Sequence, residues 1–566
     1  MANSDTKQFS IYWHNVENAP VILDVLARED IVYGSSISYM ATDLRPVFAE
    51  EKFLLSVILP KEFSDAWDKS IWADKSSHFF IDGKKVKKSV SQALNKCNID
   101  ILQKKVQDFI PSRDILLEEQ EQIERFIRCN QLRLDKIIND QNYDSEGWPR
   151  GAVPFILEAV KRNKSRHPFV SFSGGKDSTV VSHLVMQALS NPSIIHIFGD
   201  TTLEFPETYK YIYRFRSKHN RTPFFIERND ASNFMDLCKK IGPPSRVKSW
   251  CCSIFKTGPM GTTLADMGID LLTFYGVRRL ESTSRSKYKR VTPSPKLEMQ
   301  HVAAPIIDWL DIDVWLYILA QKLDFNKAYR YGFSRVGCWC CPNNSNWSDM
   351  LTAVYNPENY LEWNNFLVDF ARQIGKEDAE IYVKDGKWKA RHGGEGLDVH
   401  MTKVNSKNCT VENNARQYNL TRPLSNEFYE LFKPFGKLDF TLGRAQLSEV
   451  FVISKQNDML LKISGAPKGR TVRITIFPAF LKLANSFVNI KNAYSYIERQ
   501  IRKFQTCMYC MACNSVCPVG ALKVTDGKYE INDGKCIHCL KCVTHFPAGC
   551  LLASALGTKN NMEIQE

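Results

Sequence analysis

The sequence contains no long apolar run. Nowhere in its 566 residues do apolar side chains continue for the roughly 18 positions that a membrane-spanning helix needs. The first residues also lack the basic and then apolar order of a signal peptide. We therefore expect a cytoplasmic protein that has no membrane partner.

Cysteine is absent from the first part of the chain and concentrated elsewhere. None precedes Cys97, which excludes a cysteine-ligated metal ribbon before that residue. Of the 17 cysteines, eight lie between Cys507 and Cys550, and five lie in two tight groups at 251–252 and 338–341. Such spacing in a cytoplasmic chain favours metal or iron–sulfur ligation over disulfides.

Composition and charge are otherwise ordinary. Hydrophobic residues make up 44% of the chain and charged residues 24%, as in soluble globular proteins. The length predicts about three or four domains. The formal net charge of +13 fits an anionic nucleotide as well as a nucleic acid, so charge alone does not identify the partner.

A phosphate-binding loop is predicted after the short strand at 169–172. A Ser-Gly-Gly turn leads there into a pattern in which Val180, Val181 and Leu184 recur at helical spacing. Glycines let backbone N–H groups face an anion, and the helix N-terminus adds a favourable dipole. The spacing is not that of a Walker loop, and a plain helix-capping turn is the alternative. The loop residues are Ser173, Gly174, Gly175, Lys176 (a mobile positive charge), Asp177, Ser178 and Thr179.

Four ordered blocks between residues 165 and 345 carry a resemblance to a known family. They are 173–179, 200–208, 276–285 and 305–309, and they resemble the phosphoadenosine phosphosulfate (PAPS) reductase-like family of the adenine nucleotide alpha-hydrolase superfamily. The resemblance implies that ATP, adenosine phosphosulfate or PAPS binds at the loop. It implies catalytic roles for Lys176, Asp177 and Arg279, and nucleotide contacts for Asp200, Glu207, Arg278, Arg279 and Arg285.

Strand and helix patterns alternate through the middle of the chain, which predicts an α/β domain with a doubly wound parallel sheet. In such sheets the ligand lies beyond the carboxyl ends of the strands, so we expect Ser173 and Asp200 to share one cleft. A hairpin at 79–88 carries a lysine run, which favours either an edge strand or a nucleic-acid contact. The expected divisions are an α+β accessory region (1–112), a helical linker (113–165), the loop-bearing domain (166–345), a helical region (346–445), a β-rich connection (446–503) and a ferredoxin-like α+β 4Fe-4S domain (504–556).

The C-terminal cysteines follow the spacing of two-cluster ferredoxins. Crosswise ligation makes one cluster complete, whereas the other lacks a fourth cysteine because Phe546 stands at the expected position. Its fourth iron could take Cys550 or His545, or be absent in a three-iron cluster, and we favour the incomplete cluster. The expected ligands are Cys536, Cys539, Cys542 and Cys517 for the complete cluster, and Cys507, Cys510 and Cys513 for the other.

A second cysteine set lies in the loop-bearing domain. A doubled cysteine followed by Cys-x-x-Cys resembles the four-iron site of assimilatory sulfonucleotide reductases, and also the pattern of sulfurtransferases that put sulfur into DNA. A structural zinc or buried thiols are the alternatives, and Cys340 is either a bystander or a redox-active sulfur. The expected cluster ligands are Cys251, Cys252, Cys338 and Cys341.

One motif of the family is missing. Members that use thioredoxin carry a nucleophilic cysteine in Glu-Cys-Gly-[Leu/Ile]-His, and this sequence has none. We therefore predict reductive sulfur chemistry on an adenylylated or sulfonated species, with electrons from the ferredoxin-like domain and an external donor. A nucleic acid is one candidate sulfur acceptor. The alternative is a nucleic-acid-binding or partner-binding module that uses the loop as a nucleotide sensor.

Overall fold

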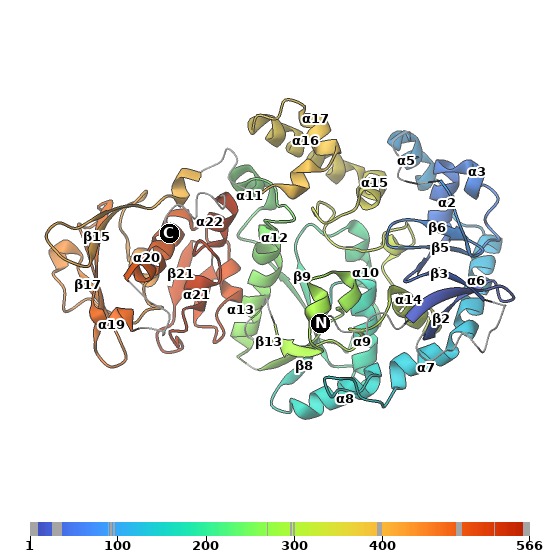
Figure 1. Ribbon diagram of the computed structural model, residues 1–566, viewed down its shortest axis with the longest axis horizontal. Coiled ribbons are helices and arrows are strands. Elements are labelled where there is room, and N and C mark those ends of the chain that lie inside the picture. Colours follow the sequence, from blue (N-terminus) through green and yellow to red (C-terminus); the bar gives the residue numbers. More distant parts are fainter. Residues whose placement is uncertain are drawn as a thin grey trace.

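The computed structural model describes residues 9–24, 37–88, 90, 93, 97–268, 270–294, 297, 300–392, 399–482, 490–525 and 527–557. Seen with its longest axis horizontal, the molecule runs from an N-terminal region at one end, through a central α/β domain, to an antiparallel sheet at the other end (Figure 1). The C-terminal segment lies between the central domain and that outer sheet (Figure 1). The chain thus crosses to the far end and returns.

The central domain is built on a six-stranded sheet of order β10-β9-β8-β11-β13-β12. Neighbouring strands from β10 to β13 are parallel, and β12 is antiparallel to β13. The strand order reverses between β8 and β11, which is the switch point where ligands bind in such sheets. The predicted doubly wound sheet is therefore confirmed. Its strands are β8 (His167–Ser171), β9 (Ile195–Asp200), β10 (Phe224–Arg228), β11 (Leu271–Phe274), β12 (Val291–Pro293) and β13 (Gln300–Ala303).

Successive side chains of β8 point to opposite faces of this sheet, as the period of two requires. Phe169 packs with Leu264 of α13 on one face, and Val170 packs with Val181 of α9 on the other. The apolar spacing predicted after the loop thus places α9 on the core. The helices are α9 (Lys176–Ala188), α10 (Pro206–Lys218), α11 (Phe234–Ile241), α12 (Trp250–Cys252), the π-helix η3 (Ser253–Thr257), α13 (Gly258–Met267), α14 (Asp311–Ala320) and the 3-10 turns η4 (Arg279–Glu281), η5 (Arg285–Lys287) and η6 (Lys327–Tyr329).

The N-terminal region is α+β, as predicted, and contains two small antiparallel sheets. The hairpin turn at Asp82 and Gly83 has positive φ at both residues, and Lys84 and Lys85 form the exposed edge strand β7. This arrangement matches the edge-strand interpretation of the lysine run. The strands are β1 (Phe9–His14), β2 (Ala19–Asp24), β3 (Ile37–Ala41), β4 (Arg45–Pro46), β5 (Ile71–Ala73), β6 (Phe79–Ile81) and β7 (Lys84–Lys85), and the helices are α2 (Ala49–Ile58), α3 (Pro60–Phe63) and α5 (Ile99–Gln107).

The single helical pattern expected across the linker is divided at Asn130. Its buried side chain accepts a hydrogen bond from the backbone of Ile22 at 2.9 Å and donates to the carbonyls of Pro20 and Phe126. These bonds satisfy backbone groups of β2 that would otherwise be buried without partners. The segment therefore forms α6 (Arg113–Cys129) and α7 (Gln131–Asn139), followed by α8 (Ala152–Arg162).

The expected boundary at residue 445 is wrong, because one sheet spans it. The outer six-stranded sheet has the order β14-β15-β19-β18-β17-β16, so its first strands lie in the region predicted to be helical. Short polar strands gave no apolar alternation to find. This part contains α15 (Asn346–Tyr355), α16 (Pro357–Gln373), α17 (Ala379–Lys384), η7 (Lys387–Ala390), η8 (Val399–Thr402), β14 (Asn405–Asn408), β15 (Ala415–Asn419), α18 (Asn426–Glu430), β16 (Lys437–Asp439), η9 (Ala445–Leu447), β17 (Val450–Ile453), β18 (Met459–Gly465), β19 (Thr471–Ile476) and α19 (Pro478–Leu481).

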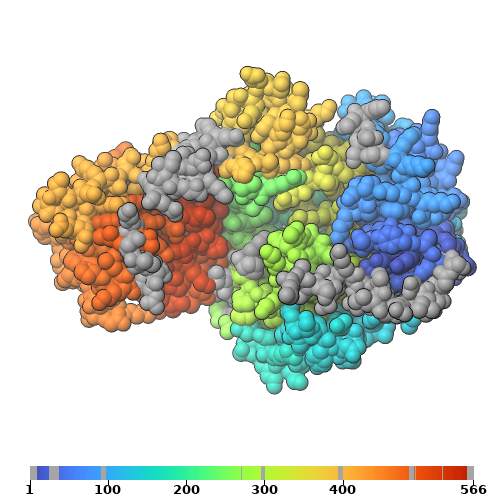
Figure 2. Space-filling view, viewed as in Figure 1, coloured from blue at the N-terminus to red at the C-terminus, as the bar shows by residue number. Residues whose placement is uncertain are grey.

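The C-terminal segment begins with a long helix that packs against the outer sheet. Ile497 and Ile501 of this helix, α20, are fully buried in the core of the outer sheet. The space-filling view shows the segment filling the space between the outer sheet and the central domain (Figure 2). Its elements are α20 (Ile490–Thr506), η11 (Ala512–Ser515), β20 (Leu522–Thr525), β21 (Lys528–Ile531), α21 (Lys541–Thr544) and α22 (Leu551–Leu556). Among the described residues, no helix has the length and apolar character to cross a membrane.

Candidate functional site

The predicted phosphate loop follows β8 directly and begins α9. Gly174 has a φ of +70°, and a Cβ there would lie 3.0 Å from Thr208, so the turn requires glycine. The hydroxyls of Ser178 and Thr179 both donate to the carbonyl of Gly175, at 2.9 and 3.1 Å. These side chains hold the turn closed from inside the loop.

Lys176 is buried rather than mobile, which corrects the sequence interpretation. Its side chain is 4% exposed, and Nζ lies 3.2 Å from Asp177 and 3.1 Å from Asp311. The backbone N–H of Lys176 donates to the hydroxyl of Tyr329 at 3.0 Å. Burial alone would lower the pKa of Lys176, but the two carboxylates outweigh burial and raise it, so the ammonium stays charged.

Arg278, in the segment that follows the neighbouring strand β11, completes this ion network. Its Nε donates to Asp177 at 2.5 Å and its Nη2 donates to Asp311 at 2.6 Å. Its Nη1 is buried and has no hydrogen-bond partner among the residues that the structure describes. The close approach of the segment after β11 to the phosphate loop depends on Gly276, because a Cβ there would lie 2.6 Å from the backbone of Asp177. Burial would raise the pKa of Asp177, but Arg278 and Lys176 outweigh it and hold that pKa well below its usual range.

The remaining residues predicted to contact the nucleotide lie further out. Arg279 pairs with Glu146 at 2.8 Å and with Asp308, and Arg285 pairs with Glu281. These guanidinium groups face carboxylates, so the structure leaves their predicted phosphate contacts untested.

Asp200 is the last residue of β9, beside the loop strand, and Glu207 lies in the first turn of α10. Asp200 accepts hydrogen bonds at 2.8 Å from the Tyr209 hydroxyl and from the backbone of Thr202. Glu207 pairs with Lys210 at 2.7 Å. Because β8 and β9 are parallel neighbours, Asp200 and the loop lie at the same edge of the sheet, as predicted.

The segment after β9 also reaches the cysteine set of this domain. Glu204 forms a β-bridge with Cys338, and the backbone of Trp339 donates to the carbonyl of Leu203 at 2.9 Å. The Thr201 hydroxyl lies 3.3 Å from the Cys338 sulfur. One stretch of chain therefore connects the nucleotide-side strand end to the cysteines.

The four predicted cysteines of this domain converge. Cys251 and Cys252 end the short helix α12, where the wider π-helix η3 follows, and Cys338 and Cys341 close a turn. A hydrogen bond with Cys252, followed by burial, raises the pKa of Cys251 well above its usual value, and the sulfur of Cys338 adds to the effect. Cys252 is exposed, whereas Cys340 is buried in the apolar core, as a bystander thiol would be.

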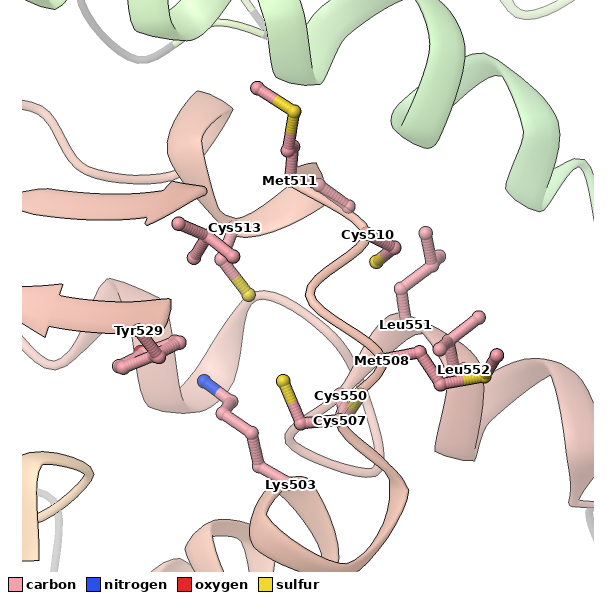
Figure 3. Close-up of a pocket in the computed structure, with 12 residues that line it drawn as sticks. Lys503, Cys507, Met508, Cys510, Met511, Cys513, Tyr529, Cys550, Leu551 and Leu552 are labelled. Carbon is pink, nitrogen blue, oxygen red and sulfur yellow. The ribbon is translucent and has the colours of Figure 1, made fainter. Parts of the chain in front are cut away.

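The C-terminal cysteines line two separate cavities. Cys507, Cys510, Cys513 and Cys550 line one cavity, together with Lys503 and Tyr529 (Figure 3). Cys517, Cys536, Cys539 and Cys542 line the other. Four thiols around each cavity is the donor set that a four-iron cluster requires, with one thiolate for each iron.

The two cysteine runs fold alike. Tyr509 and Met511 have positive φ in the first run, and His538 and Leu540 have positive φ at the equivalent positions of the second. Positive φ is uncommon for residues with a side chain, so its repetition marks a strained loop that turns successive sulfurs inward. Among the described residues, there is no group of three or more His, Cys, Asp or Glu side chains that could hold a single metal ion.

Cys550 supplies the fourth thiol that sequence reasoning expected to be missing. Phe546, at the expected position, is buried in the apolar core, and His545 is exposed. The chain turns back at Gly549, which has a φ of +81° and where a Cβ would lie 2.5 Å from Arg499 of α20. The preference for an incomplete cluster is therefore not supported. Gly549 immediately before Cys550 was the sequence signal for this turn.

The first C-terminal cavity is adjacent to the cysteines of the central domain. The cysteines Cys251, Cys338, Cys340, Cys510 and Cys550 belong to one buried apolar cluster or pack directly against it. The Asn229 amide donates to the carbonyls of Ile254 and Cys510, at 3.1 and 3.4 Å. Asn229 therefore links the loop of Cys510 to the segment that follows Cys252.

Comparison with known proteins identifies two domains. Residues 167–344 match the model of the phosphoadenosine phosphosulfate reductase domain, and residues 499–547 match that of a 4Fe-4S dicluster domain. The chain thus contains a PAPS reductase-type domain fused to a C-terminal iron–sulfur domain, as the sequence motifs predicted.

Individual relatives cover only parts of the chain. An uncharacterised protein of Methanocaldococcus jannaschii is 32% identical over 44% of this chain and 50% of its own length, and a second from that organism is 30% identical over 50% and 65%. The match thus spans less than two thirds of these relatives. An adenosine 5'-phosphosulfate reductase of Bacillus thuringiensis is 28% identical over 36% of this chain and 84% of its own length.

Solved structures resemble the fold only weakly. A PAPS reductase from Candida auris in a phosphate complex has a TM-score of 0.27 and 15% identity, covering 33% of this chain and 89% of its own. An FMN adenylyltransferase from Candida glabrata also has a TM-score of 0.27, with 14% identity over 42% of this chain and 69% of its own. Scores this low support no inference.

Proposed function

We propose that this protein is an oxidoreductase that binds a sulfonated adenine nucleotide at the loop of residues 173–179 and reduces it with electrons delivered by the fused iron–sulfur domain. Its substrate is adenosine phosphosulfate or PAPS. The second branch of the same proposal is adenylation of an acceptor from ATP, followed by sulfur transfer. Both branches use the same loop and the same cysteine sites.

The nucleotide part of the proposal rests on the switch point between β8 and β11. The segments that follow these two strands carry the cationic side chains of Lys176 and Arg278, and within the described part of the chain the buried Nη1 of Arg278 has no hydrogen-bond partner. A guanidinium N–H without a partner is costly, and an anionic oxygen would satisfy it. Loop backbone N–H groups at the start of α9 add donors for phosphate oxygens.

The redox part rests on a single observation. The two cysteine sets, more than 150 residues apart in sequence, share one buried core in which Cys340 and Cys510 are both members. Cys251, Cys252, Cys338 and Cys341 would hold one cluster, and the two C-terminal sets of four cysteines would hold two more. When bound, such clusters carry single electrons.

The electron balance favours a fused carrier domain. Conversion of a sulfonated nucleotide to sulfite and the free nucleotide breaks one oxygen–sulfur bond and needs two electrons, which an external low-potential donor must supply. The sequence lacks the cysteine motif that accepts the sulfonate in thioredoxin-dependent relatives. Electrons must therefore reach the nucleotide by another route, and the contiguous cysteine sites provide one.

The test is an assay of anaerobically purified protein for two products, sulfite and pyrophosphate. Iron and sulfide are counted first, and about twelve irons per chain are expected for three four-iron clusters. The protein is then mixed with adenosine phosphosulfate, PAPS or ATP, with and without reduced methyl viologen. Sulfite formed only with the reduced donor supports the first branch, and pyrophosphate released from ATP supports the second. Salt-sensitive RNA or DNA binding with neither product would favour a nucleic-acid-binding module instead.

A matched pair of variants tests the redox part. Replacing Cys341 by Ser removes one ligand of the central set, and it should remove about four irons and sulfite formation together. Replacing Cys409, a cysteine outside all three sets, by Ser should change neither quantity. Full sulfite formation in Cys341→Ser would contradict the proposed route.

A further inference from the structure

A lysine is buried between the two C-terminal cysteine cavities. Lys503, near the end of α20, is 1% exposed, and it lines the cavity of Cys507, Cys510, Cys513 and Cys550. Figure 3 shows its ammonium group pointing into this cavity, between Tyr529 and the sulfur of Cys507. The same ammonium donates to the backbone carbonyl of Cys542, a member of the other set, at 2.6 Å. Lys503 thus touches both sites.

This ammonium has an unusual electrostatic environment. A buried charge that has no opposite charge nearby costs several kcal/mol, so buried lysines normally pair with carboxylates. Here the ammonium lies in a cavity lined by Cys507, Cys513 and Cys550, and it donates to the carbonyl of Cys542.

The position is also fixed from several sides. The ammonium lies 5.6 Å from the centre of the Tyr529 ring, and the carbonyl of Lys503 accepts from the backbone N–H of Cys507 at 2.8 Å. A side chain held at both ends has one orientation, so its charge acts at a defined place. Lys503 lines the same cavity as Cys507, Cys513 and Cys550, which is the cavity nearer the central domain.

We propose that Lys503 is a positioning residue that sets the order of reduction potentials of the two C-terminal clusters. A nearby positive charge stabilises the more negative, reduced form of a cluster and so raises its potential. Because Lys503 faces Cys507, Cys513 and Cys550, the cluster of that set has the higher potential. This rests on the proposed function, in which these cysteines carry clusters.

The consequence is a direction for electron flow. Cys517, Cys536, Cys539 and Cys542 would hold the cluster that takes single electrons from an external donor, which is oxidised, and Cys539 is exposed. Cys507, Cys510, Cys513 and Cys550 would hold the cluster that accepts each electron next, because the charge of Lys503 favours its reduced form. The electron then lies next to the central domain, where the shared core contains Cys510 and Cys340.

The test is a redox titration of the holoprotein followed by electron paramagnetic resonance. Lys503→Met removes the charge and keeps the length of the side chain, Lys503→Arg keeps the charge, and Lys541→Met removes an exposed lysine beside Cys542 as the matched control. In Lys503→Met, the higher of the two midpoint potentials should fall, and the gap between them should narrow. Lys503→Arg and Lys541→Met should stay close to the wild type.

The remaining outcomes of this titration either overturn the proposal or support it. Unchanged potentials in a fully loaded Lys503→Met protein overturn it, and so does an equal shift in Lys503→Arg. If Lys503→Met loses iron, retention of iron in Lys503→Arg supports the role of the charge, whereas loss in both variants overturns it. Potentials are measured without substrate, so failure of the nucleotide assay leaves this test intact.

Discussion

At the scale of single residues, the nucleotide-side network is close to electrically neutral before any ligand arrives. Lys176 and Arg278, both buried, are balanced by Asp311 and by the partly buried Asp177. Burial, followed by the charge of Asp311, raises the pKa of Asp43, which lies beside them. The mutual attraction of these ions offsets the large cost of removing them from water. Removal of one ion therefore destabilises the protein more than removal of one partner of an exposed ion pair would.

Lys176→Ala should therefore destabilise the protein by about 3–5 kcal/mol, because it leaves two carboxylates to share one arginine. It should also weaken nucleotide binding, with the iron content unchanged. Urea unfolding and calorimetric titration with nucleotide measure the two effects. Lys210→Ala removes an exposed lysine paired with Glu207 and should cost less than about 1 kcal/mol. Equal losses of unfolding free energy in Lys176→Ala and Lys210→Ala would contradict a stabilising role for the ion network.

Cys550→Ser should convert one four-iron cluster to a three-iron form, because it removes one of the four thiols around that cavity. Electron paramagnetic resonance of the oxidised protein detects the three-iron signal, and iron analysis gives the loss. The control adds Phe546→Cys to the Cys550→Ser variant. Residue 546 faces the apolar core, so a thiol there should not restore the four-iron cluster. A silent Cys550→Ser would return the assignment to an incomplete site.

At the scale of elements, the iron–sulfur domain is held against the central domain by a close helix contact. A Cβ at Gly261 of α13 would lie 2.8 Å from the backbone of Ser515 in η11. A Cβ at Gly258 would lie 2.8 Å from the carbonyl of Met511. Two glycines one turn apart thus let the backbone of α13 lie close to the backbone of residues 511–515. This contact is next to the loop that carries Cys510 and Cys513.

Gly261→Val should separate these elements and cost about 1–3 kcal/mol, because backbone atoms cannot move aside as a flexible side chain can. Electron transfer between the two domains should slow, which stopped-flow absorbance after mixing with a reduced donor would measure. Asp266→Asn removes only the exposed pair with Lys523 across the same interface, at 3.2 Å, and should have little effect. Unchanged transfer in Gly261→Val would argue against this contact as the route.

His196 gives the sheet a pH dependence. It is buried on β9, where Nδ1 donates to the Ile194 carbonyl and Nε2 accepts from Ser182 of α9, both at 2.8 Å. Burial lowers the pKa of His196 to about 4, from about 6.5 in the unfolded chain. Between these values only the unfolded state binds the proton, so stability falls as pH falls from about 6.5 to 4, by up to about 3 kcal/mol.

Urea unfolding at several pH values measures how the unfolding free energy changes with pH. His196→Gln should reduce this change between about pH 4 and 6.5, because glutamine does not titrate there. Other histidines with lowered pKa, such as His183 and His219, remain in the variant and should leave a smaller slope. A slope as steep as that of the wild type would mean that His196 contributes nothing.

Elements with strong local patterns were predictable, and contacts between distant residues were not. The strand and helix around Ser173 follow from apolar spacing, and so does the alternation that gives β9, β10 and β11. The partners of Lys176 could not be found, because Asp311 lies 135 residues away and its carboxylate resembles any helix-capping aspartate. Cys550 was misjudged because spacing rules ignore a turn made possible by Gly549.

At the scale of the whole molecule, the cysteine sites lie inside the cores that join the parts together. Cys517 belongs to the core shared with the outer sheet, and Cys510 and Cys550 belong to the core shared with the central domain. Cluster assembly and folding of this end of the molecule are therefore coupled.

Removal of iron by a chelator under reducing conditions should lower the unfolding free energy of the C-terminal half by several kcal/mol, because cluster binding stabilises only the folded form. Thermal unfolding with and without the chelator measures the change, and reductant alone is the control. Residues 490–557 should also become sensitive to protease. Identical melting curves for the iron-loaded and iron-free protein would show that the cores hold without clusters.

The contacts of Asp43 have a consequence for synthesis of the chain. Its carboxylate accepts hydrogen bonds from the backbones of Asp311 and Ile312 at the start of α14, at 3.1 and 3.2 Å, and Arg45 donates to the carbonyl of Gly332 at 3.2 Å. These partners leave the ribosome about 270 to 290 residues later, which at about 5–20 residues per second is roughly 15 to 60 seconds. For that time Asp43 and Arg45 lack these hydrogen-bond partners. We expect nascent chains arrested before Asp311 to be retained by chaperones, and chains released after Gly332 to escape them.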